Sequence, residues 1–74
     1  MKNINYEEIY KNLHNGYRYE NKYDGYEKIC LAPEGFIFWQ HCGSSATEDS
    51  IEDLKFIIDV IFKEDFNELI MVKI

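Results

Sequence analysis

Two turn signals, with glycines ten residues apart, constrain the fold of this 74-residue chain more than any other feature. Tyr23-Asp24-Gly25 and Pro33-Glu34-Gly35 each end in glycine, which closes a three-residue hairpin loop at little steric cost. Aromatic and polar residues alternate in segment 17–21, and apolar residues flank the second turn on both sides. This pattern is typical of strands with one buried face, so the sequence predicts a three-stranded antiparallel meander.

The two loops also predict which residues face each other across the strands. The first loop places Tyr19 opposite Ile29 and Glu20 opposite Lys28, which pairs apolar with apolar and acid with base. The second loop, read as three residues, places Ile29 opposite Trp39. We expect the helices to pack on the sheet face that carries Tyr17, Tyr19, Ile29, Leu31, Ile37 and Trp39. Phe36 and Phe38 then stand on the opposite face, beside Cys30.

Amphipathic helices are predicted on both sides of the meander. Asn5 and Glu8 form a capping pair before the first helix, which we expect over residues 5–14 and which ends at Asn15-Gly16. Residues 48–63 form the clearest helix, and either Ser45 with Glu48 or Thr47 with Ser50 can cap it. The apolar side of this long helix comprises Ile51, Leu54, Ile57, Ile58, Ile61 and Phe62.

The last segment, residues 69–74, is rich in β-branched residues and predicts a fourth strand along a sheet edge. The alternative is a short terminal helix, because Asp65 and Glu68 also form a capping pair. The sequence therefore predicts an α+β fold: helix, three-stranded antiparallel meander, long helix, then a C-terminal strand or short helix. We expect one domain over residues 1–74, since so short a chain cannot build a second core.

The formal net charge of −6 is unevenly distributed along the chain. Residues 1–47 hold six acids and five bases, whereas residues 48–74 hold eight acids and three bases, giving −1 and −5. Such a field attracts basic surfaces and repels nucleic acid and anionic membranes. We therefore expect a protein partner with a basic surface, and neither direct nucleic-acid binding nor membrane binding.

Catalytic and metal-binding motifs are missing from the sequence. His41 and Cys42 are neighbours in a predicted strand, where adjacent side chains point to opposite faces and cannot act as a base and a nucleophile. Cys30, Cys42 and the two histidines lack the short paired spacings of a metal site. We predict free thiols, no enzymatic activity, no catalytic residue, no metal site and no cofactor.

The expected location is the cytoplasm of a bacterial host cell. Glu7 and Glu8 stand where the apolar core of a signal peptide would lie. The longest apolar runs have four residues, against the roughly 20 that span a bilayer.

Apolar residues among charges are the candidates for a partner-binding surface. Phe56 and Val60 interrupt the acidic outward side of the long helix, and Phe36 and Phe38 stand on the uncovered sheet face. As alternatives, the carboxylates form a solvated surface, and the fourth strand or a second copy of the chain covers the two phenylalanines. The candidate residues for partner binding are Glu48, Asp49, Glu52, Asp53, Phe56, Asp59, Phe36 and Phe38.

In size, acidity and order of elements, the chain resembles the small acidic anti-CRISPR proteins of phages and mobile elements. The resemblance covers about four-fifths of the chain, in architecture and charge. It implies a nucleic-acid mimic whose carboxylates oppose Lys and Arg of a CRISPR nuclease, with Phe56 as an apolar anchor. The alternative is a self-associating structural or regulatory module, a possible homodimer, through Phe36 and Phe38 or an edge strand.

Overall fold

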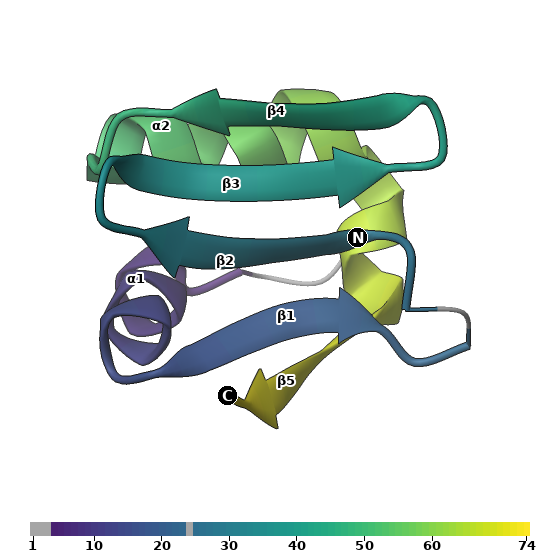
Figure 1. The fold of residues 1–74 in the computed structure, drawn as a ribbon, viewed down its shortest axis with the longest axis horizontal. Helices are drawn as coiled ribbons and strands as arrows, with labels where there is room; N and C mark the ends of the chain where they lie inside the picture. The colour runs from purple at the N-terminus through teal and green to yellow at the C-terminus, as the bar shows by residue number, and fades with distance from the viewer. Residues whose placement is uncertain (1–3, 24) are drawn as a thin grey trace.

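A computed structural model describes residues 4–23 and 25–74, and Figure 1 shows a twisted antiparallel sheet with its helices on one face. The strands are β1 (Tyr17–Asn21), β2 (Lys28–Ala32), β3 (Gly35–Gln40), β4 (Gly43–Thr47) and β5 (Leu69–Lys73), in the order β4-β3-β2-β1-β5. The helices are α1 (Tyr6–His14), α2 (Ile51–Phe56), the π-helix η1 (Ile57–Phe62) and the 3₁₀ helix η2 (Lys63–Glu68). The predicted α+β fold class is confirmed.

The first helix begins where the sequence predicts. Asn5 is the N-cap of α1, and its side-chain oxygen accepts a hydrogen bond from the Glu8 backbone N–H at 3.1 Å. The helix ends before Asn15 and Gly16, and Gly16 adopts a φ of 88° that suits glycine. Ile9 and Leu13 lie one turn apart and are both buried, so the apolar side of α1 faces the core.

The register between β1 and β2 is confirmed, with Tyr19 opposite Ile29 and Glu20 opposite Lys28. Asp24, in the predicted loop between these strands, lies outside the described residues.

The predicted register between β2 and β3 is wrong by one residue. Pro33-Glu34 is a two-residue turn and Gly35 belongs to β3, so Ile29 faces Phe38 and Leu31 faces Phe36. Because side chains alternate along a strand, this shift exchanges the two faces of β3. Phe36 and Phe38 are 0% and 7% exposed and belong to the core, whereas the partly buried Ile37 and Trp39 belong to the uncovered face.

Gly35 shows why the shorter turn forms. A Cβ atom at this position would lie 1.9 Å from the backbone oxygen of Thr47, at the end of β4. Glycine is therefore required where the end of β4 approaches the start of β3. Gly35 is the first residue of β3 and not the last residue of the turn between β2 and β3.

β4 corrects a second prediction, because the sequence predicts a meander of three strands that is followed by the long helix with no further strand between them. The two-residue turn at 41–42 folds the chain back, and all five residues of β4 pair with β3. Glycine, serine and alanine dominate this strand and carry no apolar alternation, so the sequence gives no strand signal there. β4 forms because β3 offers it a complete row of backbone partners.

The predicted long helix is confirmed as a helical segment but starts later. Ser50 is the N-cap of α2, with its hydroxyl oxygen 3.1 Å from the Asp53 backbone N–H, so neither predicted capping pair forms. After Phe56 the helix widens into η1 and then tightens into η2. The predicted apolar side does face the core, where Leu54, Ile57, Ile58 and Phe62 are all buried.

The predicted C-terminal strand is confirmed as β5, which pairs with β1 along the sheet edge. One core joins the helices to the covered sheet face. It consists of Ile9, Leu13, Ile29, Phe36, Phe38, Leu54, Ile57, Ile58, Phe62, Phe66 and Leu69.

Candidate functional site

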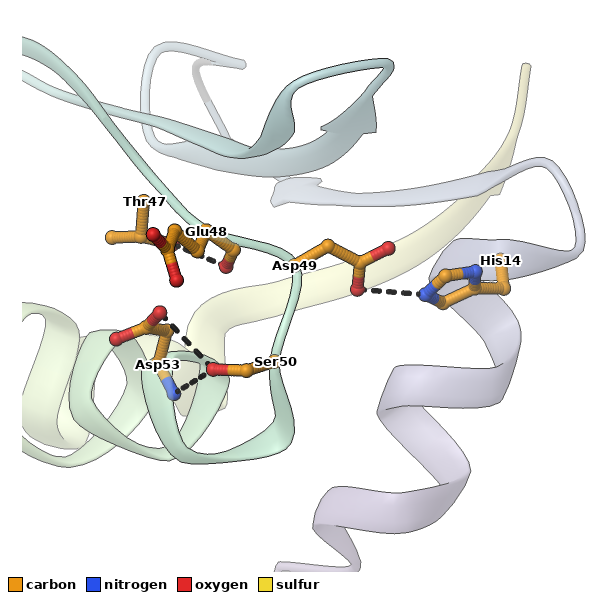
Figure 2. A network of polar contacts seen from close by, with 6 residues as sticks. All are labelled: His14, Thr47, Glu48, Asp49, Ser50 and Asp53. Carbon is orange, nitrogen blue, oxygen red and sulfur yellow. Dashed lines mark hydrogen bonds and ion pairs between the residues drawn. The ribbon is translucent and has the colours of Figure 1, made fainter.

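The predicted acidic residues lie on the helical layer, where α2 and η1 follow β4. Glu48 and Asp49 occupy the connection after β4, Glu52 and Asp53 the first turn of α2, and Asp59 the π-helix η1. Figure 2 shows the connection and the first turn, with Asp49 turned toward α1 and Asp53 turned toward Ser50. The structure thus gathers the carboxylates in one region, but they do not all serve the same purpose.

Three of the five carboxylates hold the fold together. Asp49 Oδ1 lies 3.0 Å from His14 Nε2, and this contact joins the end of α1 to the start of α2 (Figure 2). Asp59 accepts a hydrogen bond from the Tyr6 hydroxyl, which joins the start of α1 to η1. Asp53 accepts a hydrogen bond from the Ser50 hydroxyl at 3.0 Å. These groups are positioned by contacts within the chain.

The pKa values of two tyrosines of α1 are affected by the same carboxylates. A hydrogen bond to the Asp59 carboxylate raises the pKa of Tyr6, because the carboxylate stabilises the protonated phenol. Interaction with Asp49 is the main cause of the raised pKa of Tyr10. Tyr6 therefore joins α1 to η1 as a neutral hydrogen-bond donor.

Glu48 and Glu52 are exposed and have a different environment. Within the described ranges, residues 4–23 and 25–74, no hydrogen bond or ion pair joins their side-chain carboxylates to another residue. No basic group of the described residues lies within 4 Å of either carboxylate, although Lys55 follows Glu52 by three positions in α2. Of the five predicted carboxylates, these two therefore have no contact within the chain to lose when a cationic group of another molecule approaches.

Phe56 and Val60 supply apolar surface beside these charges, as the sequence predicts. Their side chains are 50% and 48% exposed. The two residues are four positions apart where α2 passes into the π-helix, a geometry that often accompanies functional sites. Gln40 of β3 donates a hydrogen bond to the Ile61 backbone oxygen at 3.1 Å, which ties the π-helix to the sheet.

The two layers of the molecule differ in charge. The helical layer, residues 4–14 and 48–68, holds ten acids and three bases, giving −7. The sheet layer, residues 15–23, 25–47 and 69–74, holds three acids and four bases, giving +1. This contrast in charge is smaller when the sequence is divided into residues 1–47 and 48–74. In the fold, β5 adds Lys73 to the sheet layer, and α1 adds Glu7 and Glu8 to the helical layer.

The sheet face away from the helices, here called the open face, carries different residues from those predicted. Ile37 and Trp39 stand on it in place of Phe36 and Phe38, and Cys30 is their neighbour as predicted. Its charges are engaged within the face, since Arg18 pairs with Glu20 and Lys28 Nζ lies 5.2 Å from the centre of the Trp39 ring. Phe36 and Phe38 cannot contact a partner from the core, so their assignment to partner binding is wrong.

His41 and Cys42 form the two-residue turn between β3 and β4, so the prediction that they lie in a strand is wrong. Cys30 in β2 and Cys42 in the turn after β3 are both free thiols, as predicted. Partial burial raises the pKa of Cys30, which disfavours the reactive thiolate. No group of three or more His, Cys, Asp or Glu within residues 4–23 and 25–74 could hold a metal ion.

Neither a protein-family model, nor a curated protein, nor a solved structure matches this chain. In the part of the chain that the structure describes, no helix is long and apolar enough to cross a membrane.

Proposed function

We propose that this chain is a non-enzymatic, acidic protein-binding protein that occupies a basic, nucleic-acid-binding surface of a partner such as a CRISPR nuclease. The observation that carries the proposal is the separation of charge between the layers, with −7 on the helical layer and +1 on the described residues of the sheet layer. A basic surface is attracted to one side of such a molecule, which fixes the orientation of approach.

The proposed contact surface is smaller than the set predicted from the sequence. Glu48 and Glu52 supply carboxylates that form no ion pair with a described residue, and Phe56 with Val60 supplies the apolar anchor. Asp49, Asp53 and Asp59 contribute to the field but are committed to contacts within the fold. Mutating these three therefore perturbs stability as well as binding, so they are poor test positions.

Inhibition of purified CRISPR nucleases tests the proposal. The chain is added to a panel of such nucleases, and DNA binding and cleavage are measured at low and high salt. We expect inhibition that weakens as salt rises, because screening reduces the attraction between exposed charges. Glu52→Lys should weaken inhibition by about tenfold or more, whereas Glu34→Lys, with the same change in net charge on the sheet layer, should change it less than about twofold.

Phe56→Ser tests the apolar anchor separately from the charges. Phe56 is half exposed, so this change should leave the fold intact while weakening binding at every salt concentration. The proposal fails if no nuclease of the panel is inhibited at low salt, or if Glu34→Lys is as damaging as Glu52→Lys.

A further inference from the structure

β4 is an unprotected sheet edge. It ends the strand order, lies at the top of the sheet in Figure 1, and four of its five residues are exposed. Proteins usually protect edge strands with lysine, proline, a bulge or a covering segment, because unpaired backbone groups there can join another strand. β4 contains Gly43, Ser44, Ser45, Ala46 and Thr47, with no charge and no proline.

The hairpin geometry shows which backbone groups are available. A two-residue turn makes the flanking pair, Gln40 and Gly43, a hydrogen-bonded pair, and such pairs then alternate along the ladder. Gly43, Ser45 and Thr47 therefore bond to β3. The N–H and C=O groups of Ser44 and Ala46 point outward, where an added strand would meet them.

The opposite edge, β5, has a different composition, with a lysine and with Ile70 and Met71, which are 46% and 48% exposed. β5 ends in Lys73, whose Nζ lies 5.2 Å from the centre of the Tyr17 ring. Met71 receives the Tyr19 hydroxyl at its sulfur, at 3.9 Å. β5 thus presents a charge and large side chains, whereas β4, with only small uncharged side chains, offers mainly its backbone.

The acidic residues near the end of β4 indicate which kind of strand can pair with it. Glu48 and Asp49 follow the strand directly, and Glu52 and Asp53 lie in the first turn of α2. A second copy, paired antiparallel through β4, would lie across a two-fold axis perpendicular to the sheet. That symmetry places two helical layers side by side, each with a net charge of −7, so like charges oppose a homodimer.

We propose that β4 receives an extended segment of a partner protein as a sixth, antiparallel strand, with Lys or Arg directly before that strand. An antiparallel segment has its N-terminal end beside Thr47, which places those basic side chains near Glu48 and Glu52. Ser44 and Ala46 exchange backbone hydrogen bonds with it. This inference rests on the proposed function, because the added strand belongs to the same basic partner.

Amide NMR with a synthetic probe tests this docking mode. The probe is the peptide Lys-Arg-Lys-Thr-Val-Thr-Val-Thr, and the control is the same composition in reverse order. We expect the first peptide to shift the amide signals of Ser44 and Ala46, to slow their hydrogen exchange by about tenfold or more, and to bind better than the reversed peptide.

Ala46→Pro removes an outward N–H that β3 does not use, so the strand can still form. It should weaken peptide binding by about tenfold. Should this variant lose its dispersed spectrum, Ala46→Lys is the second test, since it places a like charge in the path of the basic peptide. Unchanged affinity in the folded variant, shifts at β5 instead of β4, equal binding of the reversed peptide, or no shift at all would each overturn the proposal.

Two further outcomes separate this inference from the function on which it rests. Concentration-dependent shifts at Ser44 and Ala46 without peptide, together with a dimer in sedimentation, would identify a second copy as the occupant and overturn the basic strand. Loss of nuclease inhibition in Glu52→Lys but not in Ala46→Pro would overturn strand docking alone and leave the proposed function standing.

Discussion

The helical layer and the open face differ in whether their charged side chains have partners within the fold. On the open face, Arg18 pairs with Glu20, and Lys28 lies over the Trp39 ring. On the helical layer, the carboxylates of Glu48 and Glu52 have no such partner among the described residues. The difference supports the proposal that the helical layer is the side that contacts a cationic partner, because Glu48 and Glu52 form no ion pair with the described residues.

The largest expected effect tests which residues of β3 face the core and which belong to the open face. Phe36→Ala should destabilise the protein by about 3–5 kcal/mol, since it removes a fully buried ring and leaves a cavity. That is a large part of the roughly 5–15 kcal/mol that stabilises a domain. Ile37→Ala, on the open face, is the control and should cost much less. Urea unfolding followed by circular dichroism measures both, and equal costs would show that the open face is assigned wrongly.

A pair of glycines tests how closely β4 approaches β3. Gly35 and Gly43 have similar φ angles, 146° and 141°, but only Gly35 has a backbone atom where a Cβ would lie. Gly35→Ala should therefore cost about 1–3 kcal/mol more than Gly43→Ala in urea unfolding, since both changes share the strain of positive φ. Similar costs for the two variants would contradict the contact with Thr47.

The start of α2 is tested by its cap. Ser50→Ala should destabilise the protein by about 1 kcal/mol, because the Asp53 backbone N–H loses its acceptor, and Ser50→Asp should restore most of the loss. Asn5→Ala, at the cap of α1, is the matched change and should cost a similar amount. If Thr47→Ala or Ser45→Ala is the damaging change instead, the helix starts where the sequence predicts.

The smallest expected effect concerns alkaline pH. Tyr6 and Tyr10 have raised pKa values in the folded chain, mainly because of Asp59 and Asp49 respectively. The folded state therefore holds these phenolic protons more tightly, and the resulting stability is complete below pH ~10 and decreases as pH rises through the folded pKa values. The double variant Tyr6→Phe/Tyr10→Phe should show a smaller decrease in its urea midpoint above that pH. Tyr23→Phe, at an exposed position, serves as the control.

Much of the fold follows from signals between residues close in sequence. The cap at Asn5, the apolar side of residues 51–62 and the pairing of Glu20 with Lys28 depend on spacings of a few residues, and all three are confirmed. The exposure of Phe56 and Val60 follows from the same helical spacing. The candidate site is thus partly visible in the sequence.

Which of the acidic residues contact other parts of the chain cannot be predicted from the sequence. His14 and Asp49 are 35 positions apart, and Tyr6 and Asp59 are 53 apart. Only the packing of α1 against α2 and η1 brings these partners together. Sequence reasoning therefore assigns five equivalent carboxylates, whereas in the structure three of them contact other residues of the chain and two do not.

By itself, the sequence determined the α+β class, the two helical segments, the first hairpin register and the acidity, and it favoured a C-terminal strand over a short helix. Each depends on local periodicity, capping or composition. Only the tertiary structure decided the register of β3, the existence of β4 and the residues of the open face. The turn at Pro33-Glu34 could have two residues or three, and the choice depends on Gly35 making room for the backbone of Thr47, which lies twelve positions away.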